Sequence, residues 1–298
     1  MSTTLKPARL PDAGRTTVRR FARRVVRPVC AGLARLFGRT GTGFGILTYH
    51  RISPAVPGFP APTCNVTPTS FRAQLAGLLD RGYEPWPLRK ALEWAADGRP
   101  VPARAFVVTF DDGYENVYRH AWPVLRARNV PATVFLATAY LGSDEPFPFD
   151  DWAGAGVAPP EAWRPLTRGQ CAEMQAGGLI ELGSHTHTHQ AFRGRPDALA
   201  ADLSAAAAAL RESFALADAT FAFPFGFHDP EMVAVVRAAE LRCALTTEMD
   251  VVRPGTDPFG WGRFNVEDHD TPGALSGYLS GWYPLFRRLG RSACGRVT

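Results

Sequence analysis

Two short stretches of the sequence carry side chains that together could hold a metal ion and activate a water molecule. Asp111 and Asp112 stand side by side after a run of apolar and β-branched residues, and His185, His187 and His189 alternate in the second stretch. Two adjacent carboxylates raise each other's pKa unless a cation shares their charge. Because histidine nitrogens and an aspartate oxygen suit zinc or a similar divalent metal, the two stretches predict a shared metal site.

Each stretch also has a simpler interpretation when it is taken alone. Asp-Asp-Gly at the end of a strand is more often a turn or a helix cap than a catalytic site. A single histidine is more often structural or solvated than a ligand. Three histidines within five residues, in a chain that contains only seven, favour the metal. In an extended segment or across a helical turn, His185 and His189 can reach the same ion.

The candidate residues stand at the ends of expected strands. The strands expected before them lie at 44–49, 104–110, 179–183 and 219–225. In parallel α/β folds, side chains at the carboxyl ends of strands build the active site. The first strand leads to His50, which we therefore expect to line a pocket. The fourth ends on Phe225, near which backbone N–H groups are expected to bind a developing oxyanion. A solvated histidine and a plain turn are the alternatives.

Helical stretches alternate with these strands. Two further strands are expected at 131–138 and 243–247. Helices are expected at 67–82, through 122–125, and at 166–178, 196–214 and 229–240, with a loop at 141–165. Strict alternation of strand and helix predicts an α/β fold built on a parallel sheet or barrel.

Composition and charge exclude several classes of protein. No run of about 18 uncharged apolar residues occurs, so no transmembrane helix is expected; no secretory signal is recognised either. Five scattered cysteines favour a reducing compartment over a disulfide framework. Residues 1–40 hold ten Lys/Arg and one Asp, a net charge of +9 in a chain of +5, so the rest carries 5 − 9 = −4. An acidic body makes a nucleic-acid partner unexpected.

The basic N-terminal segment, residues 1–42, is expected to precede a catalytic domain at 43–298. Apolar residues recur every three or four positions from Thr17 to Phe37, with arginines between them. This pattern predicts a basic amphipathic helix kinked at Pro28. Such a helix can make peripheral contact with an anionic membrane, where each cation contributes about 1 kcal/mol. A helix packed on the domain and a disordered basic arm are the alternatives.

With these features in place, the sequence resembles the polysaccharide deacetylase family, the NodB-homology group of carbohydrate esterase family 4. The resemblance rests on "TFDDG", on "HTHTH" as an H-[ST]-x-x-H motif, and on "FPFG" as a degenerate third motif. Their order and spacing agree with the family, over about residues 43–270. The fold that the resemblance implies is a distorted, TIM-like (β/α) barrel of about seven strands.

The resemblance also implies roles for individual residues. Asp111 matches the family's catalytic base, and Asp112, His185 and His189 match its metal ligands. His187 falls at a variable position. Phe225 matches the aromatic residue whose backbone N–H helps to hold the oxyanion. The implied reaction is metal-dependent hydrolysis of an N-acetyl group, with zinc as the expected metal.

Three departures from the family pattern stand out. Ala222 occupies a position where arginine is usual. The Asp-Trp signature is not evident, although "FDDWAG" at Asp151 and "FGWGRFNV" resemble it loosely. The Leu-x-His motif that supplies the acid has no clean match. These departures resemble the exopolysaccharide branch, which also begins with a strand ending in Tyr-His, so His50 is the first candidate for a pocket residue and His269 the second.

The sequence therefore predicts a hydrolase that de-N-acetylates an amino-sugar glycan or its lipid-linked precursor. A cytoplasmic location, peripheral at the inner membrane face, fits the basic segment and the lipid-linked substrate. A barrel that has lost catalysis and only binds glycan is one alternative, and a hydrolase of a non-sugar amide is another. The oligomeric state is not predicted.

Overall fold

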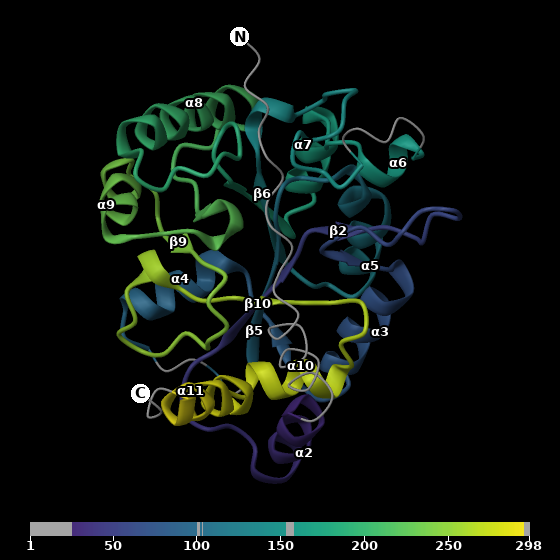
Figure 1. Ribbon diagram of the computed structural model, residues 1–298, viewed down its shortest axis with the longest axis vertical. Coiled ribbons are helices and arrows are strands. Elements are labelled where there is room, and N and C mark those ends of the chain that lie inside the picture. The colour runs from purple at the N-terminus through teal and green to yellow at the C-terminus, as the bar shows by residue number, and fades with distance from the viewer. Residues whose placement is uncertain (1–25, 100–101, 103, 153–157, 295–298) are drawn as a thin grey trace.

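A curled parallel sheet forms the centre of the protein, and helices surround it (Figure 1). The computed structural model describes residues 26–99, 102, 104–152 and 158–294. In spatial order the strands are β10 (Phe264–Asn265), β1 (Gly45–Tyr49), β5 (Ala105–Phe110), β6 (Ala132–Leu136), β7 (Ile180–Ser184), β8 (Phe221–Ala222) and β9 (Ala244–Leu245). All of these pairs are parallel, which confirms the predicted α/β fold with a path of seven strands.

Two small additions accompany this path. A short strand, β4 (Glu84–Pro85), pairs with the beginning of β5. A separate parallel pair joins β2 (Arg51–Ile52) to β3 (Asn65–Val66), directly after β1. This pair carries the chain away from His50 and forms one wall beside the strand ends.

Helices follow the strands along the chain. They are α2 (Arg27–Phe37), α3 (Pro68–Leu79), α4 (Leu88–Ala96), α5 (Trp122–Ala127), α6 (Pro160–Trp163), α7 (Arg168–Ala176), α8 (Pro196–Phe214), α9 (Pro230–Ala238), α10 (Pro272–Leu279) and α11 (Trp282–Cys294). Most of the expected helices begin at a side chain that caps the first turn. Thr67 caps α3, Asp229 caps α9, and Thr167 with Gln170 forms a capping box on α7. Neither α4 nor the short α6, within the expected loop, was predicted.

Alternate residues of the strands face two different apolar clusters. Ile46, Val107 and Phe135 belong to a cluster that also includes residues of β8 and β9, so it fills the inside of the curl. Leu47 and Val108 point the other way and pack with the helices. Strands buried on both faces explain the near-continuous apolar runs in the sequence. Truncating Phe135 to alanine would cost about 3–5 kcal/mol.

The segment from Trp261 to Val266 closes the curl between its two edges. On one side, the backbone N–H of Thr246 donates to the Trp261 carbonyl at 2.8 Å. On the other, β10 pairs with β1, and the Val266 N–H donates to the Thr48 carbonyl at 3.0 Å. Gly262 is required in this segment because a Cβ there would lie 2.2 Å from the Glu248 carbonyl oxygen.

The described part of the N-terminal segment, α2, is packed on the domain. Cys30 is buried against α10, where Gly277 allows close approach: a Cβ at this position would lie 2.9 Å from Cβ of Cys30. Arg27 pairs with Asp270 at 2.6 Å. A boundary at residue 42 would therefore separate α2 from its packing partners. Pro28 lies in the first turn of α2, where proline is tolerated, and the predicted helix before residue 26 falls outside the described residues.

Within the part of the chain that the structure describes, no helix combines the length and apolar character needed to cross a membrane.

Candidate active site

The paired aspartates lie in a tight turn directly after β5. Asp112 has φ = 70° and Gly113 has φ = 91°, so the chain turns sharply as it leaves the strand. The Asp111 N–H still donates to the Tyr49 carbonyl, whereas the Asp112 carbonyl accepts from Ala137 N–H on the neighbouring connection. The two side chains consequently reach different partners. Their carboxylates contact buried cations and imidazoles, which is not the arrangement of a helix cap.

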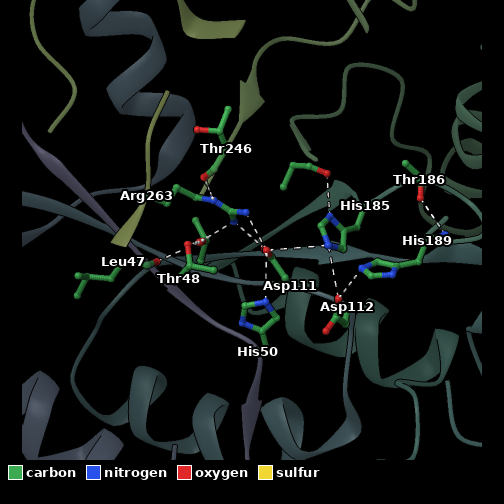
Figure 2. Close-up of polar contacts among 12 residues, drawn as sticks. Leu47, Thr48, His50, Asp111, Asp112, His185, Thr186, His189, Thr246 and Arg263 are labelled. Atoms are coloured by element: carbon green, nitrogen blue, oxygen red, sulfur yellow. Dashed lines mark hydrogen bonds and ion pairs between the residues drawn. The ribbon is translucent and has the colours of Figure 1, made fainter. Parts of the chain in front are cut away.

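The histidines after β7 meet Asp112 as predicted. Its Oδ1 lies 3.4 Å from Nε2 of His185 and 3.2 Å from Nε2 of His189 (Figure 2). One ligand atom from each of the three residues lies within 4.8 Å of the other two. His187 points elsewhere, because its Nδ1 pairs with the Thr138 hydroxyl at 2.8 Å.

Further hydrogen bonds and packing contacts orient the two imidazole rings. Nδ1 of His185 donates to the Ala222 carbonyl at 2.8 Å, which turns Nε2 towards Asp112. The backbone of His189 has φ = 53°, and its N–H donates to the Thr186 hydroxyl at 3.0 Å. The ring of His189 stacks on Phe149, with centroids 3.8 Å apart. Its Nδ1 is buried without a hydrogen-bond partner among the described residues.

The donor set fits a divalent metal. Two imidazole nitrogens and one carboxylate oxygen are the three-ligand set of many catalytic zinc sites. All three residues are buried, so a cation would be shielded from water by protein on most sides. The Oδ1 atom of Asp112 faces the Nε2 atoms of both histidines.

Asp111 is held by an arginine that the sequence analysis did not identify. Nη1 and Nη2 of Arg263 donate to its two carboxylate oxygens, each at 2.7 Å (Figure 2). Nε of Arg263 donates to the Thr246 carbonyl at 3.0 Å, and the whole side chain is buried inside the curl. A bidentate pair of this kind fixes both the position and the charge of the carboxylate.

Arg263 comes from the closing segment, in the stretch "FGWGRFNV" that resembled the family's Asp-Trp signature only loosely. It brings a guanidinium into the site, although Ala222 stands where the family usually has arginine. The available signal was a single arginine between Trp261 and Phe264, inside an otherwise apolar segment. A charge in such a segment requires a buried partner.

The electrostatics of the two aspartates differ from those of solvent-exposed carboxylates. Burial tends to raise the pKa of Asp111, but Arg263, His185 and His50 hold it below its usual value. Burial also tends to raise the pKa of Asp112, yet hydrogen bonds from His185 and His189 hold it well below. Both carboxylates are therefore ionised at neutral pH, which is the state that a general base and a metal ligand require.

The pKa values of the two histidines shift in opposite directions. Burial tends to lower the pKa of His185, but Asp111 and Asp112 raise it above its usual value. Burial dominates for His189, whose pKa falls despite its contact with Asp112. A positive charge between the two imidazoles and the aspartates is therefore favoured by the surrounding carboxylates.

His50 and Phe225 lie beside this group, as expected from their strand-end positions. Nε2 of His50 is 3.9 Å from Oδ2 of Asp111. Phe225 is 48% exposed, and its ring packs against His189 with centroids 4.7 Å apart. Its backbone has φ = 58° and ψ = 1°, an unusual conformation for a non-glycine residue.

His269, the second candidate for a pocket residue, is not brought to the site. Its Nε2 pairs with Arg27 at 3.0 Å and with Glu267 at 3.3 Å, and its side chain is 58% exposed. The reason is topological: after β10 the chain makes a turn, in which the Asp270 N–H donates to the Glu267 carbonyl, and then continues into α10. The prediction that His269 lines the site with the other residues is therefore corrected.

A cavity of about 290 Å³ opens over these side chains. Its lining residues are His50, Arg51, Thr63, Cys64, Asp111, Asp112, Tyr114, Phe149, Asp151, His185, His189, Phe225, Thr247 and Asn265. Asp151 accepts hydrogen bonds from the Thr63 backbone and hydroxyl, so it joins two loops at the rim. Its neighbour Asp150 is buried and pairs with Arg51 at 2.5 Å.

Fold and site together define a barrel-type hydrolase with paired aspartates and a histidine pair at the strand ends. Residues 98–244 match the family model described as polysaccharide deacetylase. The chain belongs to the polysaccharide deacetylase family, carbohydrate esterase family 4, and is a hydrolase of carbon–nitrogen bonds.

Individual relatives agree with this assignment. The poly-β-1,6-N-acetyl-D-glucosamine N-deacetylase of Staphylococcus aureus (strain MSSA476) is 22% identical over 213 residues, which is 68% of each chain. The solved structure of IcaB from Ammonifex degensii is 28% identical, with a TM-score of 0.68 over 80% of this chain and 97% of that one. The Streptococcus pyogenes deacetylase PplD, at 19% identity and a TM-score of 0.68 over 80% of this chain and 99% of that one, shares the fold.

Proposed function

We propose that this protein is a metal-dependent N-deacetylase that removes acetyl groups from N-acetylated amino sugars in a glycan. One observation carries the proposal: Asp112, His185 and His189 converge beside Asp111, whose charge Arg263 stabilises. The activity for which the Staphylococcus aureus relative is named makes a polymer of N-acetylglucosamine the first candidate substrate. A lipid-linked amino sugar is the second.

Asp112, His185 and His189 would hold the metal, and zinc is the first candidate because it takes nitrogen and oxygen ligands in open three-ligand sites. When bound, such an ion polarises the acetyl carbonyl and lowers the pKa of a water molecule. The remaining chemistry falls to the side chains and backbone of the chain itself.

Asp111 is the general base in this proposal. It is buried, ionised and fixed by two hydrogen bonds, so it is poised to accept the proton of the attacking water. The Phe225 N–H is assigned to the acetyl oxygen as negative charge develops on it. His50, on the other side of Asp111, donates the proton to the departing amine. Cleavage of the carbon–nitrogen bond then yields acetate and a free amino sugar.

The test combines metal analysis with acetate release. The full-length protein, purified without added metal, is assayed for bound metal and then for acetate released from N-acetylglucosamine oligomers and from lipid-linked N-acetylglucosamine. Chelation is expected to abolish release, and zinc to restore it. The variant D111N is expected to bind metal normally but to lose at least about a hundredfold in rate.

The outcomes separate the alternatives. A protein that binds the oligomers but never releases acetate, with or without metal, is a glycan-binding barrel. Turnover of other amides combined with inertness on sugars indicates a hydrolase of non-sugar amides. Full activity in the chelated protein would rule out the metal-dependent mechanism.

A further inference from the structure

A second, larger cavity lies at the opposite end of the barrel from the active site. It has a volume of about 980 Å³ and lies between α2, α10 and the turns that precede β4 and β5. Gly41, before β1, and Arg104, before β5, line it, whereas His50 and Asp111 follow the same strands. Because β5 has six residues, the two ends are roughly 20 Å apart.

Among the described residues that line this cavity, every charged side chain is positive. Four arginines line it and no carboxylate does: Arg35, Arg39, Arg81 and Arg104. Arg81 and Arg104 are anchored by backbone carbonyls, because Nη1 of Arg81 donates to Gly77 at 2.6 Å and Nη1 of Arg104 donates to the Arg81 carbonyl. A guanidinium has five N–H donors, so these bonds leave most of that capacity for a ligand.

Three of the four arginines act electrostatically on one buried hydroxyl, that of Tyr83. Tyr83 donates to the Ser276 carbonyl or hydroxyl on α10. Burial raises the pKa of Tyr83, and the positive charges of Arg39, Arg104 and Arg81 oppose that rise. Like charges that act on one atom also repel one another, and an anion between them would offset the repulsion. Arginine recognises phosphate with paired hydrogen bonds, which makes a phosphate group the best-matched anion.

An exposed apolar surface adjoins the cavity. On α2, Leu36 is 76% and Phe37 68% exposed, and they stand between Arg35 and Gly38, which both line the cavity. Phe37 contacts Trp282 on α11, with ring centroids 6.4 Å apart. Leu285 and Leu289 extend the exposed surface along α11. Amphipathic helices with arginines beside apolar side chains are typical of proteins that lie on an anionic bilayer.

We propose that the arginine cavity binds a phosphate group, and that the natural source of this group is the headgroup of an anionic phospholipid. The apolar side chains of α2 and α11 then insert beside it into the acyl boundary. The site gives a structural basis to the membrane contact expected from the basic N-terminal segment. It uses different residues from the deacetylase site and does not depend on the proposed reaction.

The experiment measures binding of the full-length protein to phosphatidylcholine vesicles with and without phosphatidylglycerol, and of inorganic phosphate to the protein in solution. The test variant is R35Q/R81Q/R104Q, at three exposed positions. The matched control is R126Q/R128Q/R211Q, which removes the same charge from exposed positions on other parts of the surface. Acetate release from soluble oligomers and thermal unfolding check that each variant is folded.

The wild-type protein is expected to bind only the phosphatidylglycerol vesicles, and inorganic phosphate to compete. The test variant should bind roughly a hundredfold more weakly, since each cation near an anionic surface contributes about 1 kcal/mol. The control should stay within about threefold of wild type. A second variant, L36S/F37S, should lose vesicle binding but keep phosphate binding.

Two results would overturn the proposal. Equal losses in the test variant and the control would show that bulk charge, not the cavity, attracts the vesicles. Absence of binding to both inorganic phosphate and phosphatidylglycerol would remove the phosphate site altogether. Binding of inorganic phosphate without any vesicle binding would support the phosphate site and overturn the lipid headgroup as its source.

Discussion

Arg263 and Asp111 are 152 residues apart in the sequence, and they form a fully buried bidentate pair inside the barrel. The pair determines the charge and the direction of the carboxylate that we assign as the base. Arg263 does not touch the predicted metal ligands, so it acts as a positioning residue. Its contributions to stability and to rate can be separated by substitution.

For stability, R263M is expected to lower the free energy of unfolding by about 3–5 kcal/mol, because it leaves the Asp111 charge buried without a partner. The double variant D111N/R263M removes both charges and should recover part of this loss. Urea unfolding of wild type, both single variants and the double variant completes the cycle. Strictly additive effects of the two substitutions would contradict the interpretation.

For rate, R263K keeps the charge but loses the paired hydrogen bonds. We expect kcat to fall about 10- to 100-fold, as for residues that orient an active group, while KM and metal content stay near wild type. R263M should be slower than R263K. A change confined to KM would instead place Arg263 in substrate binding.

Within the histidine motif, His187 provides a control for His185 and His189. H185A and H189A are expected to lose bound metal and about a thousandfold in rate, since several kcal/mol of transition-state stabilisation depend on the metal. H187A should keep both, because the His187 side chain contacts Thr138 and not Asp112. Metal content by elemental analysis and acetate release are measured on the same samples. Loss of metal in H187A would show that the wrong histidines have been assigned.

The proton donor can be identified by comparing hydrolysis rates for substrates whose leaving groups differ in their need for a proton. H50A is expected to slow amide hydrolysis by about 10²–10⁴-fold, because an amine departs poorly without a proton. An activated phenyl acetate has a leaving group that needs no proton, so its hydrolysis should change much less. H269A should leave both rates unchanged. Equal losses on amide and ester in H50A would favour a role in binding over one in proton transfer.

Glu181 on β7 gives a prediction for stability against pH. Burial raises the pKa of Glu181, and its hydrogen bonds come from the Arg89 N–H and the Thr133 hydroxyl. With the folded pKa above the unfolded value, the native state binds the proton more tightly. Stability is therefore lost as pH rises from the unfolded to the folded pKa.

The variant E181Q removes this titration while keeping a hydrogen-bond acceptor. Its thermal midpoint should exceed that of wild type at pH 8, and the difference should shrink as the pH falls below about 4, where the carboxyl becomes protonated in both states. Glu212 on the exposed face of α8 provides the control E212Q, which makes the same substitution at a surface position. A gain for E181Q that is constant across pH would point to packing and not to ionisation.

Strand-end residues were the most predictable part of the site. Asp112, His185 and His189 each follow a long apolar run, and the carboxyl ends of parallel strands meet at one edge, so their convergence followed from local pattern and fold class. The helices with capping residues were predictable for the same reason, because a cap is a local signal.

Residues placed by long-range closure were not predictable. β10 is two residues long and lacks the length that marks a strand, so neither its pairing with β1 nor the direction of Arg263 could be inferred. His50 and His269 both stood near strand ends, but the turn after β10 places His269 beside Arg27, whereas His50 reaches Asp111 directly after β1. The short helix α4 has no side-chain cap, which removes its starting signal.

Closure of the barrel by the segment from Trp261 to Val266 has a consequence for synthesis on the ribosome. Asp111 emerges first, and its guanidinium partner follows 152 residues later, a delay of roughly 8–30 s at the usual rates of elongation. Through that interval a carboxylate at the centre of the nascent protein lacks its guanidinium partner, so native packing around it must wait. Completion of the active site and completion of folding are thus one late event, and chains terminated before residue 261 should be substrates for chaperones and proteases.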